Sequence, residues 1–323
     1  MRQPRKRLRV YRFRTDRDRW LRRAFALCAV VLTVSLWQVG RYGIQYVRTV
    51  HLSAELEEIY LSTDDEEPLI TAQPYTVVPT TQPESPTTEL PLTDIPIATI
   101  NPLGTLPPQT YPQNPYRLIS ERFRKLRRQN GDIVGWLTID GLLSEAVVQR
   151  DNTYYLRRDY RGYHNENGAI FLDEACNLQS RPYTLTLYGH NMKSGAMFGD
   201  LRNYENIGFY RRNPFVSFDT LYENGRYVIF SVASVSINVR SSRYSGFYRL
   251  DTCTNLEREA IIQRLCELSE HTCTVEVNTD DQLLLLVTCV GDDDERRIVA
   301  ARRIREYETE NELYRNVQLS QRK

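Results

Sequence analysis

The sequence predicts a mostly β fold, a closed β-barrel with peripheral helices, preceded by a transmembrane helix and a disordered linker. Many short strand-like runs separated by turn residues follow residue 130, which is typical of barrels. An apolar run follows a basic N-terminal arm, and twelve of the chain's 15 prolines lie between Leu61 and Pro115. We therefore expect five segments: a basic arm (1–23), a membrane anchor (24–47), a Pro/Thr-rich linker (48–115), a folded domain (116–307) and a polar tail (308–323).

The composition argues against two kinds of function. The 323 residues carry 42 basic and 41 acidic side chains, so no large net charge attracts the chain to nucleic acid. Six cysteines occur without a CxxC pair, which argues against a zinc site. Cys253, Cys266 and Cys273 could supply one disulfide bridge, or they are small buried apolar residues. The acidic run 292–294 suggests either a calcium site or, as we favour, a solvated loop, so we expect no metal and no cofactor.

The N-terminal region predicts an uncleaved membrane anchor. Ala24–Val39 is apolar except for Thr33, Ser35 and Gln38, and extension through Val47 makes the run long enough to cross a bilayer, which takes about 20 residues. The positive-inside rule then places the basic arm in the cytoplasm and the rest of the chain outside the cell. A cleaved signal peptide is the alternative, but no small-x-small cleavage site follows the run. A nucleic-acid-binding tail fits poorly with an adjoining apolar span.

The segment 48–115 predicts a tether. His51–Tyr60 has the composition of a short juxtamembrane helix, and Leu61–Pro115 mixes proline with Thr, Ser, Gln and acidic residues. Such a sequence cannot bury a core and is typical of a disordered or polyproline-like chain. At ~3.1 Å per residue it reaches on the order of 150 Å, enough to hold a domain away from a membrane.

The folded domain is predicted to combine strands with a few helices. Amphipathic spacing predicts a helix over Tyr116–Gln129. A capping box formed by Thr254 and Glu257 opens a second helix, which runs to about Glu270. Its buried stripe is expected at Leu256, Ala260, Ile262, Leu265 and Leu268. β-rich runs bounded by turn residues predict strands at 134–139, 146–149, 168–172, 184–190, 214–218, 226–232, 283–289 and 296–301. We expect the tail beyond Arg305 to be frayed.

Two strand ends and one strand start carry the candidate site. Cys289 closes an apolar strand, an acidic loop over 290–295 follows, and Arg296 opens the next strand. His190 follows another strand about a hundred residues upstream. A thiolate can attack a carbonyl, an imidazole can transfer protons, and a fixed guanidinium can stabilise the oxyanion that forms. Each residue alone is more often structural, but the ordered set points to acyl transfer through a cysteine.

These motifs resemble those of sortases. The histidine region, the Thr-Leu-x-Thr-Cys signature, the following arginine strand and the entry to the first barrel strand all have counterparts between about Tyr116 and Tyr307. They are Leu187–Met192 with Met197–Leu201, Val287–Cys289, Arg296–Arg302 and Asn130–Leu137. The predicted helix between the two strands that precede the cysteine makes the domain resemble the class B variant of the sortase barrel.

The resemblance implies a membrane-anchored cysteine transpeptidase that cleaves a C-terminal sorting motif of secreted proteins after Thr. Cys289 is then the nucleophile, His190 the general acid and base, Arg296 the group that stabilises the oxyanion and substrate, and Thr288 a substrate-binding residue. The implied acceptor is a cell-wall amine of a peptidoglycan precursor or cross-bridge. The implied location is the cell membrane, with one span, a cytoplasmic N-terminus and an extracellular catalytic domain.

The family pattern selects Arg296 over Arg297, because two β-branched residues follow at the expected distance and strand alternation puts the two arginines on opposite faces. The sequence departs from the family pattern at Val290, Ala300 and Arg303, where an aromatic, a histidine and an apolar residue are common. Two other functions stay open: a pilin-polymerising sortase that uses a pilin lysine, and a catalytically inactive peptide-binding module.

Overall fold

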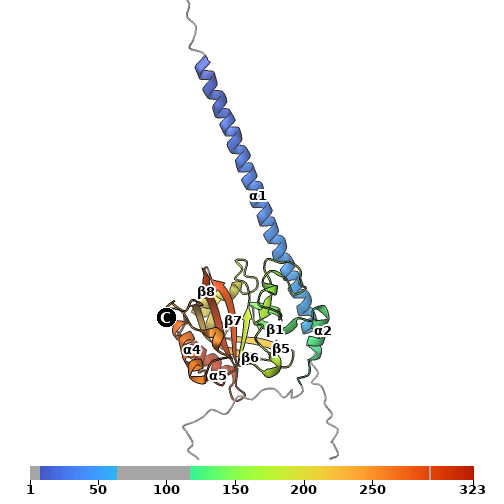
Figure 1. The fold of residues 1–323 in the computed structure, drawn as a ribbon, viewed down its shortest axis with the longest axis vertical. Helices are drawn as coiled ribbons and strands as arrows, with labels where there is room; N and C mark the ends of the chain where they lie inside the picture. Colours follow the sequence, from blue (N-terminus) through green and yellow to red (C-terminus); the bar gives the residue numbers. More distant parts are fainter. Residues whose placement is uncertain (1–7, 64–116, 291) are drawn as a thin grey trace, which may run out of the picture.

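The computed structural model describes residues 8–63, 117–290 and 292–323. Eight strands close into a barrel in the order β1-β2-β3-β4-β7-β8-β6-β5, and helices cover its outside (Figure 1). The predicted closed barrel with peripheral helices is confirmed.

The strands are β1 (Ile133–Ile139), β2 (Leu143–Val148), β3 (Ile170–Leu172), β4 (Thr184–Tyr188), β5 (Phe215–Thr220), β6 (Arg226–Ser236), β7 (Leu283–Val290) and β8 (Asp292–Arg303). The α-helices are α1 (Leu8–Leu61), α2 (Glu121–Gln129), α3 (Ile207–Arg212), α4 (Asn255–Leu268) and α5 (Glu310–Gln318). Short 3₁₀ helices are η1 (Tyr154–Arg157), η2 (Leu178–Ser180), η3 (Gly199–Glu205) and η4 (Phe247–Arg249).

Strand β7 lies between β4 and β8 in the barrel. It pairs in parallel with β4 and antiparallel with β8. The four leucines 283–286 are all fully buried, which is the pattern of a strand covered on both faces. The continuous apolar run is therefore a strand that is buried on both faces, as the sequence predicts.

The prediction of an acidic loop over 290–295 is wrong for most of these residues. Strand β8 already begins at Asp292, so the turn after β7 is short. Glu295 pairs with Ser236 of β6, and the Ile237 N–H donates to the Asp294 carbonyl at 2.9 Å. Pairing to the neighbouring strands β6 and β7 outweighs the weak β-propensity of aspartate.

Helix α4 begins with the predicted capping box, because Thr254 and Glu257 exchange side-chain and backbone hydrogen bonds. Its buried face differs from the predicted stripe. Leu256 is 78% exposed, while Ile261, Ile262 and Leu265 are buried. The predicted stripe is therefore right at Ile262 and Leu265 and wrong at Leu256, which lies in the first turn of the helix.

The tail predicted to be frayed beyond Arg305 is ordered instead. Helix α5 opens with a second capping box, formed by Thr309 and Glu312. Leu313 and Val317, four residues apart on one face, are buried. The folded domain therefore extends past the predicted boundary at 307.

Arg303, one of the departures from the family pattern, lies at the end of β8, and the β7–β8 ladder runs without a register shift from Leu283 to Cys289. Arg303 pairs with Tyr227 across β6 and β8. Its guanidinium donates to the Gln282 side chain at 3.2 Å and to the Asn224 carbonyl at 2.7 Å. A buried guanidinium is tolerated where its hydrogen bonds are made. The two hydrogen bonds therefore allow an arginine at a position where an apolar residue is common.

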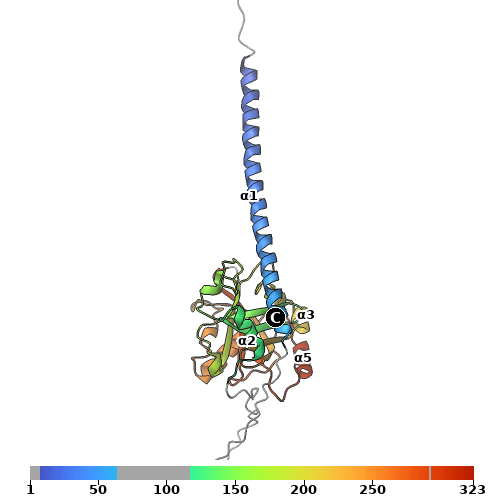
Figure 2. The same ribbon diagram turned by 90° about the vertical axis from the view of Figure 1, so that its right-hand side faces the viewer.

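Helix α1 runs without a break from Leu8 to Leu61 and projects far from the barrel (Figures 1 and 2). Its part from Arg19 to Leu61 contains an exposed window that is long and apolar enough to cross a membrane. The linker predicted from residue 48 is wrong for residues 48–61, which belong to helix α1. Leu52, Leu56 and Tyr60 lie on one face of the helix and are buried in the barrel's core cluster. The helix predicted over His51–Tyr60 is thus confirmed as part of α1, while the linker expected over 64–115 lies outside the described residues.

Candidate active site

The parallel pair β4–β7 brings two predicted site residues to one edge of the barrel. Tyr188 is the register partner of Val287, and the Gly189 N–H donates to the Val287 carbonyl at 3.2 Å. His190 and Cys289 each lie two residues beyond this matched pair. The carboxyl ends of neighbouring parallel strands meet at the same sheet edge, so the topology places His190 beside Cys289.

Strand β8 brings the predicted arginine to the same place. Cys289 and Arg296 are direct partners in the antiparallel β7–β8 ladder, and directly opposite residues share a face of the sheet. The side chain of Cys289 lies outside what the structure describes, so this placement rests on the backbone.

His190 is held by contacts on both sides. Gly189 permits close packing of the Phe198 ring, since a Cβ at this glycine would lie 2.8 Å from ring atoms. The Phe198 N–H donates to the His190 carbonyl at 3.0 Å. The half-exposed ring places Nε2 2.6 Å from the Leu156 carbonyl oxygen. Because a carbonyl only accepts, Nε2 carries a hydrogen, and Nδ1 is the basic nitrogen of the neutral ring.

Arg296 and Arg297 face different surroundings. Arg297 is buried, forms an ion pair with Glu205 and stands opposite Thr288. Arg296 is half-buried, and its Nη1 donates to the Glu295 carbonyl at 2.9 Å. The alternation predicted for these two arginines is present in the register. It places Arg296, and not Arg297, on the face shared with Cys289.

Tyr188 extends this face, although the sequence gave no reason to single it out. Its hydroxyl donates to Asp173 Oδ2 at 2.9 Å. Burial and the Asp173 carboxylate raise the pKa of Tyr188, and the Arg296 guanidinium opposes that rise. The charge of Arg296 therefore acts on the residue two positions before His190, which supports Arg296 as the arginine that faces the site.

A surface cavity of about 540 Å³ lies beside His190. It is lined by Asn191, Met192, Lys193, Arg202, Glu205 and Arg297. Both signs of charge occur in this lining, so the cavity suits a polar or charged group. The Arg297–Glu205 pair forms part of its wall.

Thr288 lies beneath the site. Its side chain is 2% exposed, and within the described part of the chain its buried hydroxyl has no hydrogen-bond partner. Direct contact with a substrate would need a local movement, so the role predicted for Thr288 stays a prediction.

Two other kinds of site are a second cysteine nucleophile and a metal centre. Burial raises the pKa of the Cys176 thiol to about 12, which keeps it protonated and unreactive near neutral pH. Among the residues that the structure describes, no group of three His, Cys, Asp or Glu side chains is arranged to hold a metal ion. Cys176 is therefore a poor alternative nucleophile.

Comparison with known proteins agrees with this geometry. The family profile of the sortase domain matches residues 137–304. Sortase B of Listeria monocytogenes is 31% identical over 170 residues, which make up 51% of this chain and 66% of that protein. The match thus spans slightly less than two thirds of the relative's length.

Solved structures extend the likeness to three dimensions. Sortase B from B. anthracis superposes with a TM-score of 0.59 over 81% of this chain and 99% of that chain, at 23% identity, and so shows the fold. A Staphylococcus aureus sortase B–substrate complex has a TM-score of 0.52 over 58% of this chain and 87% of that chain, at 26% identity.

A closed barrel with a cysteine, a histidine and an arginine at one end carries the three groups that cysteine-dependent acyl transfer uses. The chain belongs to the sortase family. Within that family it is similar to class B, because the relatives found by sequence and by structure are sortase B proteins.

Proposed function

We propose that this protein is a membrane-anchored transpeptidase that attaches secreted proteins to the cell wall. It cleaves a C-terminal sorting motif after Thr and transfers the acyl group to an amine of the peptidoglycan precursor or cross-bridge. The observation that carries the proposal is the register at the barrel edge. His190 and Cys289 lie at equal offsets beyond the Tyr188–Val287 pair, and Arg296 is the register partner of Cys289, which supports a shared site for the three residues.

The first half of the reaction follows from these positions. The Cys289 thiol gives its proton to Nδ1 of His190, and the thiolate attacks the carbonyl carbon of the scissile bond so that a C–S bond forms. The carbonyl oxygen becomes an oxyanion, and the Arg296 guanidinium donates hydrogen bonds to it. His190 protonates the leaving nitrogen, the C–N bond breaks, and a thioester remains on Cys289.

The second half reverses these roles. An acceptor amine attacks the thioester, His190 takes a proton from the attacking nitrogen, and the C–S bond breaks to restore the Cys289 thiolate. Water is the competing nucleophile at this stage.

The membrane location rests on helix α1. Its apolar window spans a bilayer by length and composition, and the basic residues before it favour a cytoplasmic N-terminus. The barrel at the other end of the helix then faces the outside of the cell, where sorting motifs and wall amines are found.

A two-acceptor assay tests the proposal. The full chain in detergent micelles receives a quenched peptide carrying a class B sorting motif, together with either a wall-peptide amine or a pilin-type lysine peptide. We expect cleavage after Thr and a transfer product with the wall amine. Transfer to the pilin-type lysine alone would replace the acceptor, and the absence of cleavage with intact folding would favour a peptide-binding module.

A further inference from the structure

The C-terminal part of helix α1 packs against the loop over residues 157–169. This loop follows helix η1, whose Leu156 carbonyl contacts the His190 ring. The helix presents Thr49 to this loop, and Thr49 is 6% exposed. Its hydroxyl donates to the Gln45 carbonyl at 3.0 Å and accepts from the side-chain amides of Asn165 (3.2 Å) and Asn167 (2.9 Å). Both asparagines are buried. Thr49 Oγ1 is thus the shared acceptor for two amides that water does not reach.

The two asparagines are tied to the segment that contacts His190. The Asn165 N–H donates to the Arg157 carbonyl at 3.0 Å, and the Ala169 N–H donates to the Tyr155 carbonyl at 3.1 Å. Gly168, at φ +64, lies so close that a Cβ there would be 2.7 Å from the Leu156 oxygen. Residues 165–169 therefore fix the position of helix η1, and the Leu156 carbonyl of η1 accepts from His190 Nε2.

A second contact holds the same loop from its other end. Arg48 Nη2 lies 3.1 Å from Asp159 Oδ2, and the Asp159 carboxylate accepts from the N–H groups of Arg161 and Tyr163. A small cavity beneath the helix is lined by Thr49, Asp159, Asn165 and also Met197, whose backbone bridges to Asn191 next to His190. The docked helix thus adjoins both chain segments that surround the histidine.

We propose that Thr49 is a positioning residue: through Asn165 and Asn167 it fixes the loop whose Leu156 carbonyl holds the His190 ring in one orientation and tautomer. This inference rests on the proposed function for its catalytic consequence, because a misplaced acid and base slows both proton transfers. The helix that anchors the chain in the membrane is by this account also a support of the active site.

The test replaces Thr49 by Val in the full chain in micelles, which keeps the shape and removes the shared acceptor. Thr49→Ser restores the hydroxyl. Thr33→Val is the matched control, since Thr33 also bonds its own helix, at the Val30 carbonyl, but is exposed and far from the loop. Nitrogen-15 spectra of histidine-labelled protein, which has four histidines, report the tautomer of His190 without any need for turnover.

We expect a single Nε2–H tautomer of His190 in the unchanged chain, Thr33→Val and Thr49→Ser, and a mixture of tautomers in Thr49→Val. The turnover number kcat of Thr49→Val should fall about ten- to hundredfold with little change in KM, as for a catalytic group displaced by about 1 Å. An unchanged tautomer and kcat in Thr49→Val would overturn the inference.

Two further outcomes are separable. If Thr49→Val does not fold, Arg48→Ala tests the same loop through an exposed arginine, with a smaller change in the same direction expected and no change contradicting the inference. If the unchanged chain neither cleaves nor transfers, the proposed function fails, while the tautomer measurement still decides whether Thr49 positions His190.

Discussion

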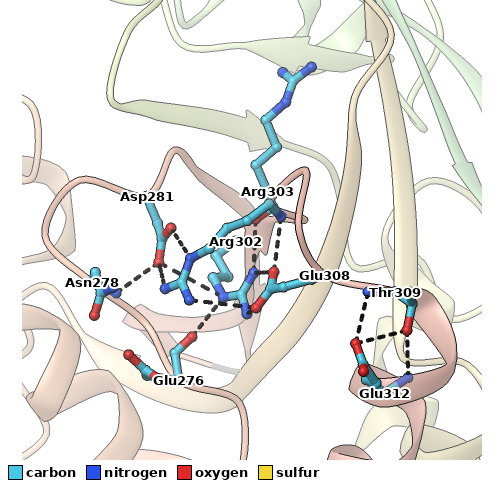
Figure 3. A network of polar contacts seen from close by, with 9 residues as sticks. Glu276, Asn278, Asp281, Arg302, Arg303, Glu308, Thr309 and Glu312 are labelled. Carbon is cyan, nitrogen blue, oxygen red and sulfur yellow. Dashed lines mark hydrogen bonds and ion pairs between the residues drawn. The ribbon is translucent and has the colours of Figure 1, made fainter. Parts of the chain in front are cut away.

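Strand β8 carries arginines at both ends, and the two ends differ in how those arginines are used. At the far end from the site, Arg302 is 1% exposed and bound by Glu308 through two contacts of 2.6 Å (Figure 3). Arg305, just beyond the strand, is bound by Asp281 at 2.8 and 2.6 Å. At the site, Arg296 is half-buried and its Nη1 donates to a backbone carbonyl.

The difference teaches how to separate a structural arginine from one that serves chemistry on the same strand. A deeply buried guanidinium needs carboxylates around it, because an uncompensated buried charge is very costly. Such an arginine has little capacity left for a ligand. A guanidinium near solvent beside a nucleophile can reorient its donors toward a developing oxyanion.

The largest effect is expected at the structural end. Asp281→Ala removes the nearer of two carboxylates beside the buried Arg305 and a second one beside Arg302, so the free energy of unfolding should fall by about 3–5 kcal/mol. Urea titration followed by circular dichroism measures this. The activity per folded molecule should stay close to that of the unchanged chain, and a selective loss of turnover with normal stability would break the proposed division of strand β8.

The next effect is expected at the catalytic end. Arg296→Ala should raise the barrier for cleavage by about 3 kcal/mol, as for loss of an oxyanion donor, with an unchanged unfolding midpoint. Arg297→Ala should be milder for turnover, since Arg297 is engaged by Glu205. Steady-state kinetics on the sorting-motif peptide decides between them. An inactive Arg297→Ala beside an active Arg296→Ala would exchange their roles.

Glu145 is a half-buried carboxyl group whose neighbours on helix α1 are Ser53 and Glu57. Burial raises its pKa to about 7, the Ser53 hydroxyl lowers it, and Glu57 raises it. Because the folded state raises the pKa of Glu145, it favours the protonated carboxyl group. The contribution of this group to the free energy of unfolding is therefore complete below its unfolded pKa, near 4.5, and is lost as the pH rises through about 7.

We therefore expect the full chain to unfold at lower urea at pH 8 than at pH 5, with a contribution of roughly 3 kcal/mol from this group. Glu145→Gln should remove most of the difference between the two pH values. An equally large pH dependence in Glu145→Gln would assign the effect to other groups.

The smallest effect concerns the ordered tail. Thr309→Ala removes the N-cap of α5 and should lower the free energy of unfolding by about 1 kcal/mol. Thr254→Ala, at the other capping box, is the matched control and should cost about the same. A Thr309→Ala chain as stable as the unchanged one would mean that α5 contributes nothing measurable to the domain.

Local patterns in the sequence predicted the strands and the residues at their ends. The apolar run 283–289 and the Gly189–His190 strand end could be predicted because a continuous apolar stretch and turn residues leave a clear pattern in the sequence. What the sequence could not provide is the partner of each strand. The pairing of β4 with β7 joins residues about a hundred positions apart, and only this pairing brings His190 to Cys289.

Contacts made by backbone atoms were also unreadable. The Leu156 carbonyl that accepts from His190 has no side-chain signature, and Thr49 resembles any other threonine of a helix. The acidic start of β8 and the polar tail were wrongly predicted for one shared reason. Composition indicated solvent, whereas pairing with β6 and packing of Leu313 and Val317 supplied the order.

Trapping the acyl-enzyme tests the central claim most directly. The chain is mixed with the sorting-motif peptide, quenched in acid and mapped by mass spectrometry. Our account predicts a thioester on Cys289 that hydroxylamine removes, its absence in Cys289→Ala together with all cleavage and transfer, and slower formation by about 100- to 10,000-fold in His190→Ala. An acyl group found on another residue, or cleavage that persists in Cys289→Ala, would contradict it.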